Sequence, residues 1–369
     1  MKWLQKGKSI NMKKVLYVSN IEVPYRTEFF NMLSKKCDLT VLYERESVIG
    51  RNEQWCRSIE NNFKEIFFRG INIKNEFSFS IKLIKYILVQ KYDVIIFGCY
   101  NSLVQIVAMY ILKILNKNYI LNIDGEYFLE GNSIKQKLRR RILSGAQYYL
   151  VAGETNIDEI KKISKKNNVK AYYFSTLKQD EIEKNEMNKN NVKKINNILV
   201  VGRYSPEKGQ NLVLEIAKVE KDLNFKFIGS DNKSKELKNR IENMNLKNVD
   251  VVPFLNKEKL NIEYRKAGAI IVPSIKECWG LIINEAASFG VPIISSNQTG
   301  AAVEFLGNEY AKYLFESGNV NDLGKKIELL KKDKKIIEYK KYLINKSKLY
   351  SIEKMVECYM EVINGGENK

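Results

Sequence analysis

The sequence predicts an α/β protein in which two Rossmann-like domains, each a doubly wound parallel sheet, face a cleft. Short apolar runs that end in turn residues alternate with stretches whose apolar residues recur at helical spacing, which is typical of a parallel sheet covered by helices. This alternation occurs twice, and residues 180–196, mostly charged or amide side chains, separate the two series. A chain of 369 residues is also long enough for two domains that each bury a core.

The predicted boundaries follow this alternation. We place the N-terminal domain at residues 1–178, a connector at 179–196 and the C-terminal domain at 197–350. Strands are predicted at 15–18, 39–43, 94–97, 119–122 and 148–151, and again at 198–201, 226–228, 249–252, 269–272 and 292–295. Helices are predicted in the first domain at 26–36, 81–91, 102–115 and 134–143.

Composition narrows the classes of function. The formal net charge of +19 favours an anionic partner, namely a polyphosphate ligand, an acidic membrane face or nucleic acid. A background rich in Lys and Asn is the alternative explanation of that charge. Because the chain has no histidine, His-based zinc sites, Ser-His-Asp triads and histidine general bases are excluded.

The sequence predicts a cytoplasmic protein, either soluble or peripheral at the inner face of the membrane. The five cysteines are dispersed without Cys-x-x-Cys spacing, which indicates reduced thiols. Residues 1–11 lack the apolar core of a signal peptide or anchor, and the most apolar stretch, 103–115, is too short to span a bilayer. The basic helix 134–143 could rest on anionic lipid headgroups, with a solvated basic face as the alternative.

An acidic pair marks the most informative segment of the chain, residues 270–300. A buried strand ends at Pro273-Ser274, Glu277 follows in a loop, and Glu285 lies on a helix that is expected to start near Gly280. Ligands of doubly wound sheets bind at the carboxyl ends of strands, where helix N-terminal amides can meet anions. An extended ligand with hydroxyls at both ends and negative charge between them, such as a nucleotide diphosphate sugar, could meet both carboxylates. A solvated helix with two surface carboxylates is the alternative.

A basic turn in residues 197–209 points to the same kind of ligand. A predicted strand runs into Gly202, which permits close approach to the backbone, and Arg203 can make a forked contact with phosphate oxygens. Lys208 adds a compact point charge. Taken alone, this segment is equally typical of a basic surface turn.

Together the two segments resemble the donor site of family 4 glycosyltransferases, which are retaining enzymes of the GT-B fold. The resemblance rests on Glu-x7-Glu after a strand ending in Pro-Ser, followed by Glu-Ala-Ala-Ser-Phe-Gly-Val-Pro-Ile-Ile, and on the Gly-Arg…Glu-Lys-Gly turn. It implies that the donor diphosphate meets two cations, the sugar hydroxyls meet Glu277, the ribose meets Glu285, and Glu207 steadies the turn. The implied donor-binding residues are Gly202, Arg203, Lys208, Glu277, Cys278, Trp279, Gly280, Leu281 and Glu285. It also implies that a helix in residues 351–369 crosses back onto the N-terminal domain.

The acceptor half resembles a narrower branch. In place of the family's glycine-rich loop it has Pro24-Tyr-Arg26 followed by Phe-Phe, and later Asn-x-Asp-Gly, as in enzymes of bacterial capsule, exopolysaccharide or lipopolysaccharide assembly. The histidine that many relatives carry here is absent, and Asp124 is the best polar substitute, expected to orient the acceptor hydroxyl. The expected acceptor-side residues are Arg26, Tyr100, Asn101 and Asp124. A helix arginine held by a carboxylate, and an Asp-Gly turn without catalytic duty, are the alternatives for Arg26 and Asp124.

The resemblance implies a retaining glycosyltransferase that moves a sugar from a nucleotide diphosphate sugar to a glycan or lipid-linked glycan. The expected catalytic residues are Glu277, Arg203, Lys208 and Asp124. Because no Asp-x-Asp motif occurs, we expect neither an essential metal nor a cofactor other than the sugar nucleotide as co-substrate. A GT-B epimerase or hydrolase, and a basic nucleic-acid-binding protein, are the competing functions. Nucleic acid is not expected as a partner, because no recognised binding motif is present.

Overall fold

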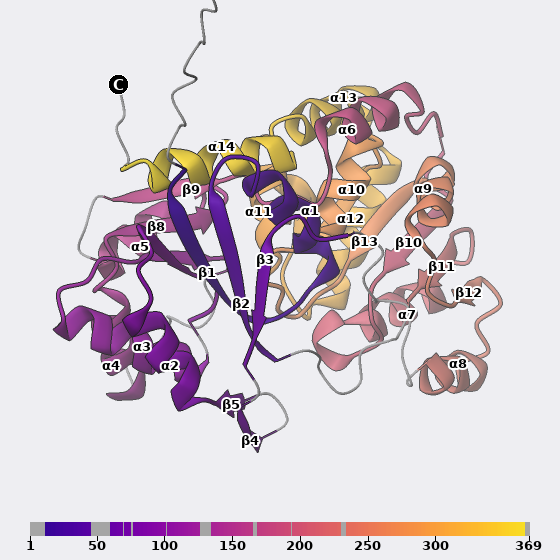
Figure 1. Cartoon of the computed structure of the whole chain (residues 1–369). Helices are drawn as coiled ribbons and strands as arrows, with labels where there is room; N and C mark the ends of the chain where they lie inside the picture. Colours follow the sequence, from indigo (N-terminus) through magenta and orange to yellow (C-terminus); the bar gives the residue numbers. More distant parts are fainter. Residues whose placement is uncertain are drawn as a thin grey trace, which may run out of the picture.

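The fold consists of two parallel β-sheets flanked by helices (Figure 1). The computed structural model describes residues 12–45, 60–68, 70–74, 77–100, 102–125, 134–164, 168–192, 194–229 and 234–365. The first sheet has the strand order β3-β2-β1-β6-β7-β8-β9, and the second has the order β12-β11-β10-β13-β14-β15. In the first sheet the strand order changes direction between β1 and β6, and in the second between β10 and β13. Ligands of such folds bind at this switch point.

The first half carries the seven-stranded sheet. Its strands are β1 (Lys14–Ile21), β2 (Asp38–Arg45), β3 (Lys64–Phe67), β6 (Val94–Phe97), β7 (Ile120–Ile123), β8 (Tyr148–Ala152) and β9 (Val169–Tyr172). Its helices are α1 (Pro24–Leu33), α2 (Ile81–Val89), α3 (Leu103–Ile114), α4 (Ile134–Leu143) and α5 (Ile157–Ser164). A small antiparallel pair, β4 (Ile71–Lys74) and β5 (Phe77–Phe79), precedes α2.

The second half carries the six-stranded sheet. Its strands are β10 (Asn197–Val201), β11 (Asn224–Ile228), β12 (Val249–Val252), β13 (Ala269–Val272), β14 (Ile293–Ser296) and β15 (Leu314–Phe315). Its helices are η2 (Pro206–Lys208), α7 (Gln210–Val219), α8 (Ser234–Asn243), α9 (Lys257–Lys266), α10 (Ile282–Ser288), α11 (Gly300–Leu306), η3 (Ala311–Tyr313), α12 (Val320–Lys331) and α13 (Ile336–Ser347).

The segment expected as the connector begins with a helix, α6 (Gln179–Met187). Its polar residues have specific partners: the backbone N–H of Lys178 donates to Glu181 Oε2 at 3.0 Å, and the Asn190 amide donates to Ala267 O at 2.6 Å. Lys340 on α13 donates in turn to Asn190 Oδ1 at 2.7 Å. The many charged and amide side chains of this segment therefore hold it against the second half.

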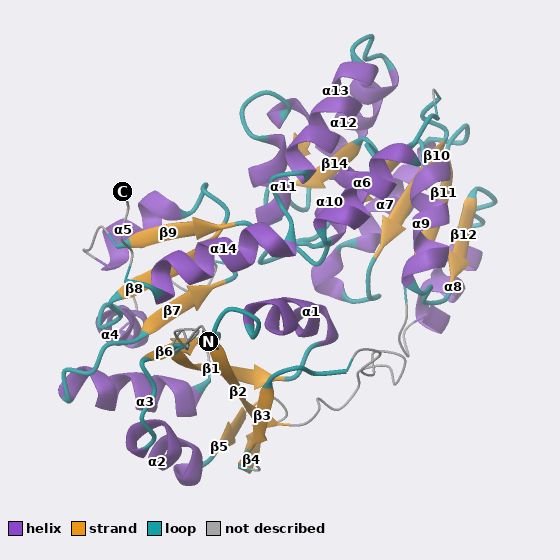
Figure 2. Ribbon diagram, turned by 45° about the horizontal axis from the view of Figure 1, so that its top comes forward, coloured by secondary structure: helices purple, strands orange, loops and turns teal. Residues whose placement is uncertain are grey.

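The last helix, α14 (Ile352–Ile363), packs against α1 and β9 of the first half (Figure 2). The Tyr359 ring lies 4.7 Å from the Phe29 ring and 5.4 Å from the Tyr172 ring, centroid to centroid. Lys13 Nζ also donates to Ile363 O at 2.9 Å. The chain passes from the first half to the second at residues 173–178 and returns at residues 348–351. These two crossings lie side by side, and the Ile352 N–H donates to Leu177 O at 2.9 Å.

Within the described residues, no helix combines the length and the apolar character that crossing a bilayer requires.

Candidate functional site

The two predicted donor segments lie side by side because their strands are neighbours. Strands β10 and β13 pair in parallel, with Ile198 opposite Ala269, so their carboxyl ends meet at one edge of the sheet. The loops that follow are joined by a hydrogen bond from the Ile275 N–H to Glu207 O at 2.8 Å. At Gly209 (φ +66°) a Cβ would lie 2.0 Å from Pro273 O, so only glycine permits this approach of the loops.

Lys208 and Glu277 form an ion pair across these loops. Their side chains are 23% and 20% exposed, so each is partly shielded and still reachable from solvent. Ser274 Oγ adds a long hydrogen bond of 3.5 Å to the same carboxylate oxygen. The sequence analysis assigned both residues to the same ligand, and in the structure their side chains are in direct contact.

The other predicted donor-binding residues differ in exposure and in backbone conformation. Arg203 is largely exposed, and its guanidinium lies 4.0 Å from Glu207, so it can move towards a ligand. A Cβ at Gly202 would meet no atom within 4 Å, so this stretch of backbone faces open space. Gly280 has φ +96° and precedes Leu281, which is half-buried before the first residue of α10.

Glu285 is fixed by a buried tyrosine that the sequence analysis did not single out. The Tyr264 hydroxyl on α9 donates to Glu285 Oε2 at 2.7 Å, and Tyr264 is fully buried. Burial raises the pKa of the half-buried Glu285, while the Tyr264 hydrogen bond and the charge of Lys257 act in the opposite direction. Tyr264 stands in an ordinary helical pattern, and nothing in the sequence marks it as a partner of Glu285.

Trp279 belongs to the junction between the two halves. Its side chain is 3% exposed, its indole N–H donates to Asn284 Oδ1 at 3.0 Å, and its ring centroid lies 6.0 Å from those of Phe174 and Tyr350. Asn284 donates onward to Phe174 O at 2.9 Å. The Trp279 side chain thus supports the loop from beneath.

Cys278 lies between this junction and the ion pair. The side chain is half-buried, and burial, followed by the charge of Glu277, raises the pKa of its thiol to about 11. The thiol is therefore neutral at pH 7, and it is a weak nucleophile there.

On the acceptor side, Arg26 and Asp124 form an ion pair. Asn122 and Tyr172 donate to the other carboxylate oxygen, so three donors hold Asp124. Arg26 is 4% exposed, and its guanidinium lies 5.0 Å from the Phe174 ring centroid. The alternative interpretation of Arg26, a helix arginine held by a carboxylate, describes what the structure contains, and this arginine does not face solvent.

The predicted donor and acceptor segments meet at Gly125 and Cys278. A Cβ on Gly125 would lie 2.5 Å from Cys278 Cβ, so the two loops are in van der Waals contact and leave no space for a side chain. The Tyr100 hydroxyl donates to Gly125 O and supports this loop. Asn101, the remaining expected acceptor-side residue, lies outside the described residues.

A buried carboxylate ties the two halves behind this contact. Glu304 on α11 is 4% exposed and accepts the backbone N–H groups of Glu154 and Thr155 at 2.9 and 3.0 Å. The Tyr350 hydroxyl donates to its other oxygen at 2.5 Å. The carboxylate of the second half thus replaces water as the acceptor for two amides of the first.

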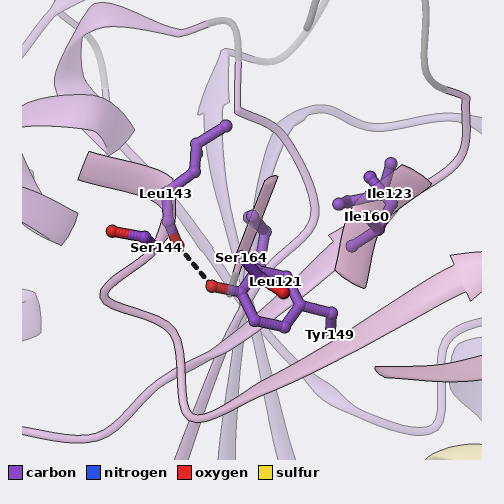
Figure 3. A pocket seen from close by; sticks show the side chains of 7 residues that line it. All are labelled: Leu121, Ile123, Leu143, Ser144, Tyr149, Ile160 and Ser164. Carbon is purple, nitrogen blue, oxygen red and sulfur yellow. Dashed lines mark hydrogen bonds between the residues drawn. The ribbon is translucent and has the colours of Figure 1, made fainter. Parts of the chain in front are cut away.

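Two hollows lie elsewhere in the molecule, one a small cavity in the core and the other an open groove. A cavity of about 10 Å³ lies between β7, β8, α4 and α5, where the Tyr149 hydroxyl donates to Leu143 O at 2.9 Å (Figure 3). It has room for about one water molecule and its lining is mostly apolar, so it is a packing defect of the core. An open groove of about 440 Å³ runs along α1 between Glu60, Lys178 and Glu353. Among the described residues, no group of three metal-ligating side chains is gathered.

Comparisons with known proteins point to glycosyltransferases. Residues 179–350 match the family model described as glycosyl transferases group 1. The chain is 30% identical over 129 residues to an uncharacterized glycosyltransferase of Methanocaldococcus jannaschii, covering 35% of this chain and 36% of that protein. It is 27% identical over 251 residues to an uncharacterized 41.2 kDa protein in the cps region of Klebsiella pneumoniae, covering 63% and 68%. The chain thus spans about a third of the first relative and about two thirds of the second.

Among solved structures, the chain is similar to Anabaena HepE in complex with UDP and glucose. The TM-score is 0.67 at 14% identity, over 96% of this chain and 100% of that one. At this identity the likeness concerns the fold, and it confirms the predicted GT-B class of two Rossmann-like parallel-sheet domains.

Proposed function

We propose that this protein is a retaining glycosyltransferase of bacterial surface polysaccharide synthesis, because its residues 179–350 match the family model described as glycosyl transferases group 1. Its donor is a nucleotide diphosphate sugar, and its acceptor is a glycan or lipid-linked glycan. The observation that carries the proposal is the Lys208–Glu277 ion pair at the adjoining ends of β10 and β13. The pair holds one cation for a phosphate and one carboxylate for sugar hydroxyls at the edge where such sheets bind ligands.

Each charged group has a proposed role in donor binding. Lys208 exchanges Glu277 for a donor phosphate oxygen, and the released Glu277 accepts hydrogen bonds from the donor sugar. The exposed Arg203 closes onto the diphosphate, and Glu285 accepts the ribose hydroxyls. The two cations stabilise the negative charge that develops on the leaving diphosphate, an electrostatic task that needs no metal.

The proposed chemistry takes place where the Asp124 loop touches the Cys278 loop. The acceptor oxygen forms its bond to the anomeric carbon on the face from which the diphosphate departs. The bond between that carbon and the phosphate oxygen breaks, and the acceptor proton passes to this oxygen. Asp124, fixed by its three donors, orients the acceptor hydroxyl. Contact between the two halves excludes water and so limits hydrolysis.

Donor binding is the decisive test. The melting temperature of the purified protein is measured with a panel of nucleotide diphosphate sugars, because a ligand of the native state raises it. We expect a concentration-dependent rise with at least one sugar nucleotide, and slow consumption of that donor until an acceptor is added. Absence of any rise across uridine, guanosine, adenosine and deoxythymidine donors would contradict the proposal. Rapid consumption of donor alone would indicate an epimerase or hydrolase instead.

A lipid-linked acceptor is held in a membrane, so the second part of the proposal is a peripheral contact of this protein with anionic membranes. Helix α3 exposes Leu103, Tyr110 and Ile114 (44%, 50% and 61%) along one face, and α3 packs between α2 and α4 (Figure 1). Exposed Lys82 and Lys85 on α2 lie in the same helical layer. Apolar side chains with cations around them are typical of surfaces that bind anionic headgroups. We expect salt-sensitive co-sedimentation with vesicles that contain phosphatidylglycerol, and equal binding to neutral vesicles would contradict it.

A further inference from the structure

The hydroxyl of Tyr264 is aimed at one oxygen of Glu285 by the packing of its ring. Tyr264 is fully buried on α9, and its ring stacks on that of Phe289 with a centroid distance of 5.6 Å and an interplanar angle of 23°. The hydroxyl donates to Glu285 Oε2 at 2.7 Å. A ring held on its face cannot swing away, so this hydrogen bond fixes the carboxylate on α10.

We propose that Tyr264 is a positioning residue of the donor site, which holds Glu285 by Oε2 and thereby presents Oε1 to the ribose of the sugar nucleotide. The inference rests on the proposed function, because it takes Glu285 as the ribose acceptor. A vicinal diol donates two hydroxyl protons, and an ionised carboxylate can accept both. Tyr264 therefore acts through Glu285 and does not itself touch the donor.

The charges around Glu285 give this arrangement a consequence that can be measured. The groups that act on it are Tyr264, Lys257 and Glu181, and Lys257 lies 2.5 Å from Glu181, so its charge is shared. Burial raises the pKa of Glu285, and the Tyr264 hydrogen bond is the main influence that keeps it from rising further. The pKa of Tyr264 is itself raised well above its ordinary value, by burial and by the charge of Glu285, so the phenol stays a donor.

The test is Tyr264→Phe, with the kinetic parameters for the donor measured against pH. Ribose contacts are equal in the ground and transition states, so we expect KM to rise about tenfold while kcat changes little. The acid limb of the kcat/KM profile should move about one unit towards higher pH, because Glu285 becomes easier to protonate. Glu285→Gln should abolish that limb, since the amide does not titrate in this range.

Tyr313→Phe is the matched control. Tyr313 is also fully buried and also donates to a carboxylate, Asp333, but it lies beside β15 at the far edge of the sheet. We expect its loss to leave KM and the acid limb unchanged. Wild-type KM and pH profile in Tyr264→Phe, or the same changes in Tyr313→Phe, would overturn the positioning role.

A measurement without donor separates this inference from the proposed function. The carboxyl pKa of Glu285 is read by ¹³C NMR of the free protein, with its signal assigned by its loss in Glu285→Gln. A higher Glu285 pKa in Tyr264→Phe supports the positioning role, and an unchanged pKa overturns it whatever the donor is. If Glu285→Gln binds nucleoside diphosphates as the wild type does, the ribose role of Glu285 fails instead.

Discussion

At the scale of single residues, Lys208 can pair with either of two anions, Glu277 or the donor diphosphate. Its proposed role is to exchange the first for the second. In the structure it neutralises Glu277, and partly exposed ion pairs of this kind contribute little to stability. A donor diphosphate offers Lys208 more negative charge than one carboxylate and leaves Glu277 free for sugar hydroxyls. The same two side chains can therefore keep the empty site neutral and then bind both parts of the donor.

Removal of either end of the donor site should reduce transfer without unfolding the protein. We expect Lys208→Ala and Glu285→Ala each to lower kcat/KM by about 10²-fold or more, since each removes a charge placed for the ligand. Initial rates of transfer and melting temperatures check this. Lys226→Ala is the control, because Lys226 pairs with Glu263 at 2.8 Å in the same sheet, away from the loops. Near-normal turnover by both site variants would refute the assignment.

Glu44 at the end of β2 predicts a pH dependence of stability. It is 2% exposed and accepts from Ser102 Oγ at 2.7 Å and Gln105 Nε2 at 2.6 Å, and burial raises its pKa to about 7. The folded-state pKa of Glu44 lies above its unfolded value of about 4.3. The stabilisation that Glu44 contributes to the folded state is therefore complete below that pH and is lost as pH rises through 7. We expect the free energy of unfolding to fall by about 3 kcal/mol over this window.

Urea titrations between pH 4 and 8 measure this effect. Glu44→Gln should flatten the slope, since the amide cannot ionise and Gln105 can turn its own amide to remain bonded. Glu258→Gln, which alters an exposed carboxylate on α9, serves as the control. An equal slope in Glu44→Gln and in the wild type would contradict the assignment.

At the scale of elements, strands with a clear apolar run were predicted well, and edge strands without one were missed. The predicted bounds 94–97 and 269–272 coincide with the central strands β6 and β13, because strands buried on both faces are continuous apolar runs. The edge strand β12 was also predicted with its observed bounds, 249–252, because three of its four residues are valines. The edge strands β3 and β9 were missed, since Lys64, Glu65 and Lys170 interrupt any apolar pattern there. Contacts such as Tyr264 with Glu285 depend on the packing of α9 against α10, which periodicity does not encode.

Helix α14 is the element whose removal should matter most to the first half. Tyr359→Ala would remove the ring between Phe29 and Tyr172 and should cost about 3–5 kcal/mol of stability, as for other buried aromatic truncations. Tyr359→Phe keeps the ring and should retain most of that stability. Chemical denaturation of the two variants compares them directly. Similar losses in both would show that the hydroxyl, and not the ring, carries the contact.

At the scale of the whole molecule, the two halves meet through groups that only this fold brings together. Glu304 caps the amides of Glu154 and Thr155, and Gly125 touches Cys278. The sequence predicted that the strand ends before Asp124 and before Glu277 would share a cleft. It gave no sign of how closely they approach, because that distance depends on the crossings at 173–178 and 348–351.

The contact at Gly125 leads to a prediction about closure. In Gly125→Ala the new Cβ would lie 2.5 Å from Cys278 Cβ, so the two loops must separate. Donor binding should persist, because its groups lie in the second half, while transfer falls by about 10²-fold, the effect of misplacing reacting groups by about 1 Å. Donor-induced melting shifts and transfer rates, measured on the same preparations, distinguish these two effects.

A second substitution identifies the cause of that loss. Cys278→Gly removes the side chain that the new methyl group meets, although the Cys278 backbone stays 2.7 Å from the same position. Gly125→Ala combined with Cys278→Gly should therefore recover part of the transfer activity, and the coupling between the two changes should be favourable. Strictly additive losses would mean that Gly125 acts through its own backbone, and the halves would then not need this contact to place the acceptor against the donor.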